Sequence, residues 1–258
     1  MNGYNEMKTT TLKITSILGL AVALAVGIPT LSRAAIELHD QVTFLDGPGA
    51  NGGIFHATEV GGSLTFDTFC TETGIQQYIN FNDPFEVVAL GLTTSGNMSA
   101  DSSFVPRTLQ PYVAWAYHEF LNQARNANDV GVGGLSGFVY SGDLALETAS
   151  ANSLQELIWT GLSPTYAPVS TSGGTLDPTI TDQWLTNFNN DVANGDWTGT
   201  GDVQIMQLVN VRTGATAQDQ LVEIPGSGNQ NPVPEANSLA TWSLLLLTGV
   251  MGLTYRRR

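Results

Sequence analysis

Apolar and polar residues alternate in several short stretches of the chain, and residues that favour turns separate these stretches. In chain order, the stretches are 36–45, 53–60, 63–70, 85–92, 203–211 and 220–224. An alternation with a period of two places every second side chain on the same face of a β-strand. We therefore expect an antiparallel, mainly β domain with the form of a β-sandwich or a barrel.

The apolar spacing changes to three and four residues in the middle of the chain, as in an amphipathic helix. The first such segment begins near Pro111. The third begins at Asp177, which precedes a proline, and ends near Gly195. We expect the second to begin at Ser153, because Glu156 follows three residues later and this spacing is typical of a capping box. The pattern predicts about three helices inserted into the β domain, and so an α+β fold.

The first 34 residues have the order of a secretory signal peptide. Lys8 and Lys13 form a short basic region, an apolar run follows at 14–28, and small residues lead to a cleavage point after Ala34. This order predicts a helix that signal peptidase removes. The alternative is a permanent N-terminal anchor, but the apolar run is shorter than the about 20 residues that span a bilayer.

A second apolar segment, 236–255, lies close to the C-terminus and has about the length of a membrane-spanning helix. A short motif precedes it and a basic cluster follows it: Val233-Pro234-Glu235-Ala236 and Arg256-Arg257-Arg258. Arginines beside a membrane helix favour the cytoplasmic side, so the body is expected outside the inner membrane. A plain tail anchor is the alternative, since it needs only an apolar run and flanking charge.

These three parts, in this order at the C-terminus, resemble the PEP-CTERM sorting signal of Gram-negative bacteria. The resemblance implies that an exosortase, a membrane transpeptidase-like protease, processes the chain after transient anchoring in the inner membrane. The product is then expected at the cell surface or in the extracellular matrix. One difference is Ala236, which stands where the family more often has a second proline. The expected domains are a signal peptide (1–34), an exported domain (35–224), a linker (225–232) and the sorting tail (233–258).

The region between the two terminal signals, 35–235, is strongly acidic. It contains three arginines, no lysine and 22 acidic residues, which give a net charge of −19. Proteins that bind nucleic acid use lysine and arginine to neutralise phosphates, so nucleic acid is excluded as a partner. An acidic composition of this kind suits a secreted protein that must stay in solution.

Most residue patterns of enzymes and metal sites are missing from the sequence. The three histidines, His39, His56 and His118, have no ligand spacing between them. His118 and Glu119 begin like the metal-binding helix of a zinc protease, but Asn122 stands where the second histidine would be. No nucleophile elbow and no phosphate-binding loop occurs. We expect no catalytic residues, no metal and no cofactor, and so a protein that is not an enzyme.

One cysteine and one glutamine are the candidates for chemistry. Cys70 is the single cysteine, so no internal disulfide can form. The motifs around the two residues are Phe69-Cys70 and Leu154-Gln155-Glu156-Leu157-Ile158-Trp159. They resemble the two halves of the thioester domains of bacterial surface adhesins. A third segment, also found in exported PEP-CTERM proteins, is Gln218-Asp219-Gln220-Leu221-Val222, so the resemblance spans roughly residues 64–224.

The resemblance to thioester domains implies that the Cys70 thiol attacks the Gln155 carboxamide, expels ammonia and leaves a reactive internal thioester. Leu154 and Leu157 depart from the family, which has a threonine and a small residue at these positions. The alternative is that Cys70 is a small buried hydrophobic residue and Gln155 an ordinary residue in the first turn of a helix.

The sequence therefore favours an adhesion or interaction module, with signal peptidase and exosortase as processing partners and an unknown surface ligand or polysaccharide. The main alternative is a non-covalent carbohydrate-binding protein of the extracellular polysaccharide. Trp159, Trp184 and Trp197 are expected in the core rather than on a sugar-binding surface. Hydrolysis by a pair of carboxylates has no supporting spacing.

Overall fold

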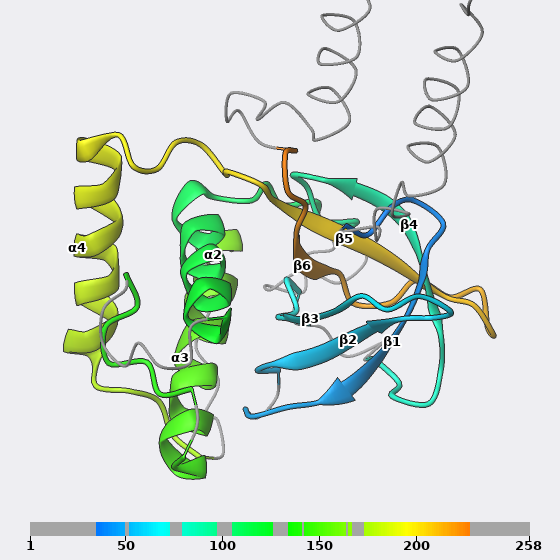
Figure 1. The fold of residues 1–258 in the computed structure, drawn as a ribbon, viewed down its shortest axis with the longest axis horizontal. Helices are drawn as coiled ribbons and strands as arrows, with labels where there is room; N and C mark the ends of the chain where they lie inside the picture. The colour runs from blue at the N-terminus through cyan, green and yellow to red at the C-terminus, as the bar shows by residue number, and fades with distance from the viewer. Residues whose placement is uncertain are drawn as a thin grey trace, which may run out of the picture. The chain divides into compact units, whose positions relative to one another are not determined.

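The computed structural model describes residues 35–49, 52–72, 79–96, 105–125, 134–140, 142–163, 165–166 and 173–227. The predicted signal peptide and sorting tail lie outside these ranges. Within the ranges, no helix has both the length and the apolar character that crossing a membrane requires. The described residues form one antiparallel sheet and three helices (Figure 1), so the expected β-rich domain with three helices is confirmed.

Six strands form the sheet, in the spatial order β3-β2-β1-β4-β5-β6. They are β1 (Gln41–Asp46), β2 (Phe55–Glu59), β3 (Thr65–Thr68), β4 (Phe85–Gly91), β5 (Val203–Asn210) and β6 (Gln220–Glu223). The predicted alternation is clear in β2, where Phe55 and Ala57 are buried while His56 is exposed. A bulge between Val87 and Ala89 interrupts the pairing of β4 with β5. Such a bulge bends the strand and increases its twist, which helps a sheet to curl.

The two edge strands of the sheet meet through the residues that follow β3. Leu221 donates its backbone N–H to the carbonyl oxygen of Phe69 at 3.0 Å. Thr71 likewise donates its backbone N–H to the backbone carbonyl oxygen of Asp219 at 2.9 Å. Between these bonds, Cys70 pairs with Gln220 in an isolated antiparallel bridge. The sheet is therefore nearly closed and barrel-like, and the closure lies at Cys70.

Three helices gather on one side of the sheet (Figure 1): α2 (Pro111–Arg125), α3 (Leu144–Leu162) and α4 (Pro178–Asn194). α2 is the central helix, because it packs against α3, α4 and β5. α4 has the predicted ends. It begins after Asp177, whose carboxylate accepts the N–H of Thr179, and it ends at Gly195 with a left-handed φ of 81°.

The start of α3 differs from the prediction. The helix begins after Asp143, whose carboxylate accepts two backbone N–H groups of the first turn. Ser153 lies in the middle of the helix, where its hydroxyl donates to the carbonyl oxygen of Ala149 and accepts the N–H of Leu176. The predicted capping box at Ser153 and Glu156 is therefore wrong, because the serine hydroxyl bonds within the helix and to the segment before α4.

Buried apolar side chains form two clusters, one enclosed by the sheet and one between the sheet and the helices. Neighbouring residues of β5 divide between them: Ile205 packs on the helix side, and Met206 packs inside. α3 contributes to both clusters, since Ile158 packs on the helix side while the next residue, Trp159, packs inside with Cys70. This helix therefore spans the boundary between the two cores.

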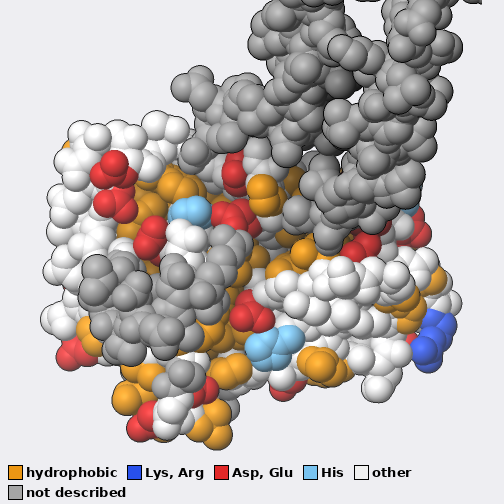
Figure 2. Space-filling model, in the orientation of Figure 1, with side chains coloured by type: hydrophobic (Ala, Val, Ile, Leu, Met, Phe, Trp, Pro, Cys, Tyr) orange, Lys and Arg blue, Asp and Glu red, His pale blue; other side chains and the backbone are white. Residues whose placement is uncertain are grey.

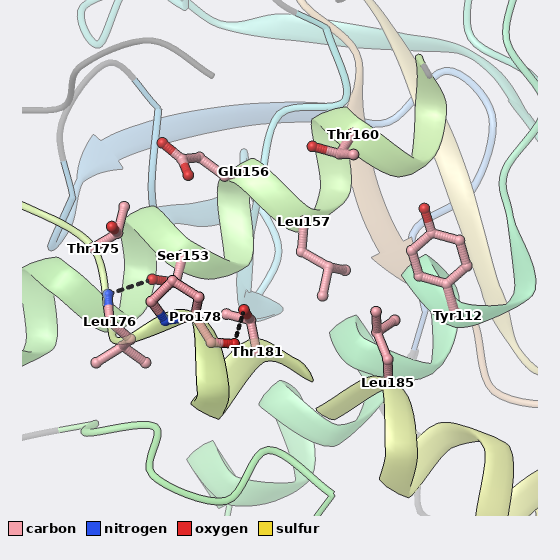
Figure 3. A pocket seen from close by; sticks show the side chains of 10 residues that line it. All are labelled: Tyr112, Ser153, Glu156, Leu157, Thr160, Thr175, Leu176, Pro178, Thr181 and Leu185. Carbon is pink, nitrogen blue, oxygen red and sulfur yellow. Dashed lines mark hydrogen bonds between the residues drawn. The ribbon is translucent and has the colours of Figure 1, made fainter. Parts of the chain in front are cut away.

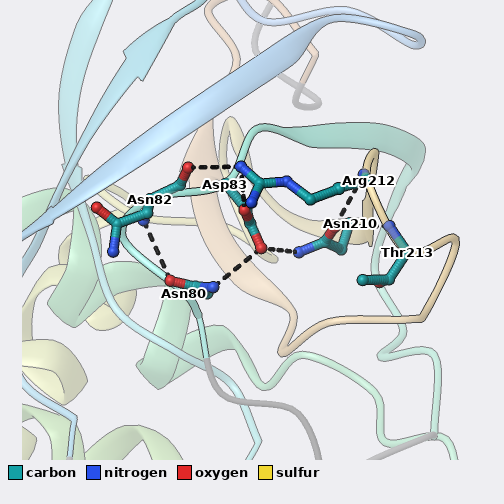
Figure 4. Close-up of polar contacts among 6 residues, drawn as sticks. All are labelled: Asn80, Asn82, Asp83, Asn210, Arg212 and Thr213. Carbon is teal, nitrogen blue, oxygen red and sulfur yellow. Dashed lines mark hydrogen bonds and ion pairs between the residues drawn. The ribbon is translucent and has the colours of Figure 1, made fainter.

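A polar network joins the turn after β5 to the segment before β4 (Figure 4). Its centre is Asp83, a buried residue whose carboxylate lies 2.7 Å from Nη2 of Arg212. The same carboxylate accepts the side-chain amide N–H groups of Asn80 at 2.9 Å and Asn210 at 2.8 Å. Three donors thus surround one buried carboxylate, which offsets the cost of removing it from water.

Candidate functional site

The candidate site lies where the sheet closes and α3 crosses its edge. Cys70 follows β3, is fully buried and packs in the enclosed core. Gln155 is in the middle of α3 and is also buried, with 1% of its surface exposed. The structure thus brings together the two residues that the sequence analysis pairs, although 85 positions separate them.

The thiol and the carboxamide make two direct contacts. Cys70 Sγ donates to Gln155 Oε1 at 3.2 Å, and Gln155 Nε2 donates to the carbonyl oxygen of Cys70 at 2.7 Å. A third bond comes from the loop between β1 and β2, where the backbone N–H of Gly53 donates to the same Oε1 at 3.2 Å. The carboxamide is therefore held at both ends, with its oxygen facing two donors.

The loop before β2 approaches the site closely because it contains glycines. Gly52 has a φ of 139°, and a Cβ at this position would lie 2.9 Å from Cγ and Oε1 of Gln155. The same Cβ would lie 3.0 Å from the indole ring of Trp159, one helical turn after Gln155. Only glycine leaves room for this approach, which brings the N–H of Gly53 to the carboxamide oxygen.

Burial raises the pKa of the Cys70 thiol well above its usual range. Its own backbone N–H and the nearby Trp159 side chain lower the pKa in part, and the charge of Glu72 raises it further. The thiol is therefore protonated at neutral pH. Because the thiolate is the nucleophilic form of cysteine, any reaction of Cys70 must remove this proton.

The surroundings of the pair have the features of an acyl-transfer site. A backbone N–H that faces a carbonyl oxygen stabilises the negative charge that develops there when a nucleophile adds to the carbon. Gly53 has this position relative to Gln155. Cys70 and Gln155 are both buried, and removal of a donor and a carbonyl from bulk water strengthens their interaction.

Buried polar residues of the segment 218–220 lie at the closure beside Cys70. Asp219 accepts the backbone N–H of Ser95 at 2.5 Å, and its own N–H donates to a carboxylate oxygen of Glu72 at 3.3 Å. Burial raises the pKa of Asp219 to about 6, against the effect of the hydrogen bonds that it accepts. Asp219 belongs to the motif Gln218-Asp219-Gln220-Leu221-Val222 of the sequence, whereas Ser95 and Glu72 come from distant segments.

A pocket of about 440 Å³ lies between α3 and α4, on the side of α3 that carries Glu156 rather than Gln155 (Figure 3). Its floor is apolar and includes Leu157 and Leu185, whereas threonine hydroxyls and the Tyr112 ring border it. Glu156 is the one carboxyl among the described residues that line it, and burial raises the pKa of this group. This arrangement suits a small, largely uncharged ligand.

Each of the three histidines contacts a carboxylate. His39 pairs with Glu86, His56 with Asp67 and His118 with Glu223. Among the residues that the structure describes, no three histidine, cysteine or acidic side chains are grouped so that they could hold a metal ion. The histidines are therefore explained by local pairing on the sheet and on α2.

The sequence predicted the pairing of Cys70 with Gln155 but not the groups that surround the pair. Gly52 and Gly53 lie at the start of the predicted strand 53–60, and nothing in the sequence there indicated that Gly53 contacts a helix residue 102 positions later. Trp159, Trp184 and Trp197 are buried, as predicted, but the position of Trp159 beside Cys70 was not foreseen. Two features of the sequence could have indicated these contacts: the two adjacent glycines, and the tryptophan that ends the motif containing Gln155.

One face of the described residues carries acidic side chains at many places and a basic group at one edge (Figure 2), in line with the net charge of the body. Comparison with protein-family models, curated proteins and solved structures finds no match to this chain. The site therefore has to be interpreted from its own geometry.

Proposed function

We propose that this chain is an exported surface or extracellular-matrix protein whose body forms an internal thioester between Cys70 and Gln155. The body then acts as an adhesion or interaction module, because an amine on a ligand can attack the thioester and become covalently attached. The export and sorting steps rest on the two terminal signals, with signal peptidase and exosortase as the processing partners. The thioester rests on the site.

The observation that carries the thioester proposal is the 3.2 Å contact between the Cys70 thiol and the Gln155 carboxamide oxygen. An ordinary buried cysteine needs no carboxamide beside it, and a buried glutamine could be satisfied by backbone groups alone. Here the amide is oriented by bonds at both ends, and Gly53 adds a donor to the oxygen. The three contacts match what addition of sulfur to this carbonyl requires.

The reaction balances without a further reagent. The Cys70 sulfur bonds to the side-chain carbonyl carbon of Gln155, the carbon–nitrogen bond breaks, and the thiol proton leaves with the nitrogen as ammonia. In the second reaction, an amine nitrogen bonds to the same carbon and the sulfur leaves. A proton from the amine then restores the thiol, so each molecule reacts once and nothing is turned over.

Intact mass spectrometry of the exported protein tests this proposal. Thioester formation lowers the mass by one ammonia, roughly 17 Da, and methylamine should then add to the protein in stoichiometric amount. Cys70→Ser and Gln155→Glu keep the side-chain shapes, and each should abolish both the ammonia loss and the adduct. Gln183→Ala, on the exposed surface of α4, is the matched control and should retain both. If the natural protein has the mass calculated from its sequence, without loss of ammonia, the thioester proposal is wrong.

The same spectra test the terminal processing. Removal of residues 1–34 gives the predicted N-terminus, and exosortase action gives a C-terminus near Val233-Pro234-Glu235-Ala236. Replacing Pro234 and Glu235 by alanine should leave the C-terminal segment attached and the protein in the inner membrane. A chain that reaches the surface with the intact tail would contradict exosortase sorting while leaving the thioester test unaffected.

The pocket between α3 and α4 favours one second candidate, non-covalent binding of carbohydrate. It combines an aromatic ring, Tyr112, with hydroxyl groups and one carboxyl, as sugar-binding sites do. Leu157→Trp would fill the pocket and should abolish binding to extracellular polysaccharide, whereas Cys70→Ser should leave it unchanged. If capture is covalent, Cys70→Ser should abolish binding and Leu157→Trp should leave it unchanged. A pull-down with the two variants therefore separates the candidates.

A further inference from the structure

Trp159 has a buried indole N–H that makes no hydrogen bond of ordinary geometry with any residue that the structure describes. The side chain is 2% exposed, and its Nε1 is not accessible to solvent. The other three tryptophans that the structure describes each donate to an oxygen at normal distance: Trp115 to Asp191 at 2.8 Å, Trp184 to Ser136 at 2.9 Å and Trp197 to Gly199 at 3.0 Å. A buried donor without an acceptor is costly and uncommon, so its retention calls for a reason.

The indole lies at the Cys70–Gln155 pair. Trp159 is one helical turn after Gln155 on α3, so the two side chains share a face of the helix. The loop residue Gly52 contacts both of them, and Trp159 packs in the same enclosed cluster as Cys70. The pKa of the thiol responds to this neighbour, since the Trp159 side chain lowers it.

The sulfur of Cys70 can also act as an acceptor. The thiol donates its hydrogen to Gln155 Oε1, so the sulfur lone pairs point elsewhere. During thioester formation, negative charge develops both on the carboxamide oxygen and on the sulfur as it loses its proton. Gly53 supplies a donor for the oxygen, and the indole N–H, which belongs to a ring in the same cluster as Cys70 and acts on the thiol, can supply one for the sulfur.

We propose that the indole N–H of Trp159 is a catalytic donor to the Cys70 sulfur. This inference rests on the proposed thioester. The N–H stabilises the sulfur as a thiolate when it attacks Gln155, and again when it leaves during attack by an amine. Trp159 transfers no proton: the thiol proton departs with ammonia in the first reaction, and the amine supplies a proton to the sulfur in the second.

The experiment removes the N–H while keeping the shape of the ring. Replacing Trp159 by benzothienylalanine, in which sulfur takes the place of the indole N–H, leaves the packing against Gly52 and Cys70 nearly unchanged. The exported protein is treated with methylamine, and the adduct is followed by intact mass. We expect thioester opening to be at least about tenfold slower, because loss of one donor to a developing charge typically costs on the order of 10²–10³ in rate and sulfur is a weaker acceptor than oxygen.

A matched control separates donation from packing. Benzothienylalanine at Trp184 removes an indole hydrogen bond to Ser136 elsewhere in the core, and it should leave the rate of opening unchanged. Equal rates for the natural protein and the Trp159 variant, both carrying the thioester, would refute the role of Trp159 alone. A natural protein without the ammonia loss would refute the thioester and this inference together. Trp159→Phe, which also lacks the N–H, should show the same slow opening.

Discussion

Gly52 lies directly against Gln155, although about a hundred residues separate them along the chain. A Cβ at Gly52 would be 2.9 Å from both Cγ and Oε1 of the glutamine, which is closer than real Cβ contacts. The absence of a side chain at Gly52 therefore sets the distance between the β1–β2 loop and α3. It also fixes where the N–H of the next residue, Gly53, meets the carboxamide.

Gly52→Ala should consequently impair thioester formation. The methyl group must displace either the loop or the Gln155 side chain, and either movement breaks the bond from Gly53 to Oε1. Gly142→Ala is the matched control, because this glycine also has a positive φ, 104°, but faces open space. Both variants carry backbone strain of about 1–2 kcal/mol, yet only Gly52→Ala should slow the ammonia loss in intact mass spectra. Equal slowing in both variants would attribute the effect to strain alone.

Asp219 predicts a specific dependence of stability on pH. Its pKa is raised by burial to about 6 in the folded protein, against about 3.9 in an unfolded chain. The folded state therefore holds this proton more tightly, so the group favours folding below about pH 4 and this contribution is lost as the pH rises to about 6. The largest effect would be roughly 3 kcal/mol for a shift of about two units.

Asp219→Asn tests this dependence because asparagine has nearly the same shape but does not titrate. Urea unfolding between pH 4 and pH 7 should show the free energy of unfolding falling with pH in the natural protein more than in the variant. Asp182→Asn, on the exposed surface of α4, controls for the loss of one negative charge. Parallel curves for the natural protein and Asp219→Asn would contradict the raised pKa.

The sequence predicted the elements whose signals are local. β2 and β5 were expected from their alternation at 53–60 and 203–211 and occur at Phe55–Glu59 and Val203–Asn210. Both ends of α4 followed from Asp177 and Gly195. The stretch 36–45 was less well predicted, because residues 37–40 form a turn, closed by a bond from the N–H of Asp40 to Glu37, and the strand begins only at residue 41.

The remaining errors and omissions concern contacts between distant parts of the chain. Ser153 and Glu156 have the spacing of a capping box, but the Ser153 hydroxyl bonds to the backbone of Ala149 and Leu176. No local sequence pattern predicts the bond to Leu176, which is 23 residues away. The pairing of Cys70 with Gln155 came from a family resemblance rather than from spacing. Gly53 and Trp159 complete the site only because the sheet closes beside α3, which is a property of the whole fold.

The corrected start of α3 leads to a prediction about helix stability. Asp143→Ala removes the carboxylate that accepts two N–H groups of the first turn, and it should lower the free energy of unfolding by about 1 kcal/mol. Asp143→Asn keeps an oxygen acceptor and should cost much less. Urea unfolding of the two variants provides the measurement. No loss of stability in Asp143→Ala would mean that the first turn of α3 contributes nothing to the fold.

The network around Asp83 allows the ion pair with Arg212 to be measured separately from its amide neighbours. The Arg212 side chain is 66% exposed, so solvent weakens the attraction, and Arg212→Met should cost only about 1 kcal/mol. Asp83 is buried and would still accept the amides of Asn80 and Asn210. Asp83→Asn should cost more, because its new amide group would face these donors. In a double-mutant cycle from urea unfolding, a coupling energy of about 0.5–1 kcal/mol that shrinks in high salt is expected. A coupling energy near zero would mean that the asparagine amides alone stabilise the buried Asp83 carboxylate.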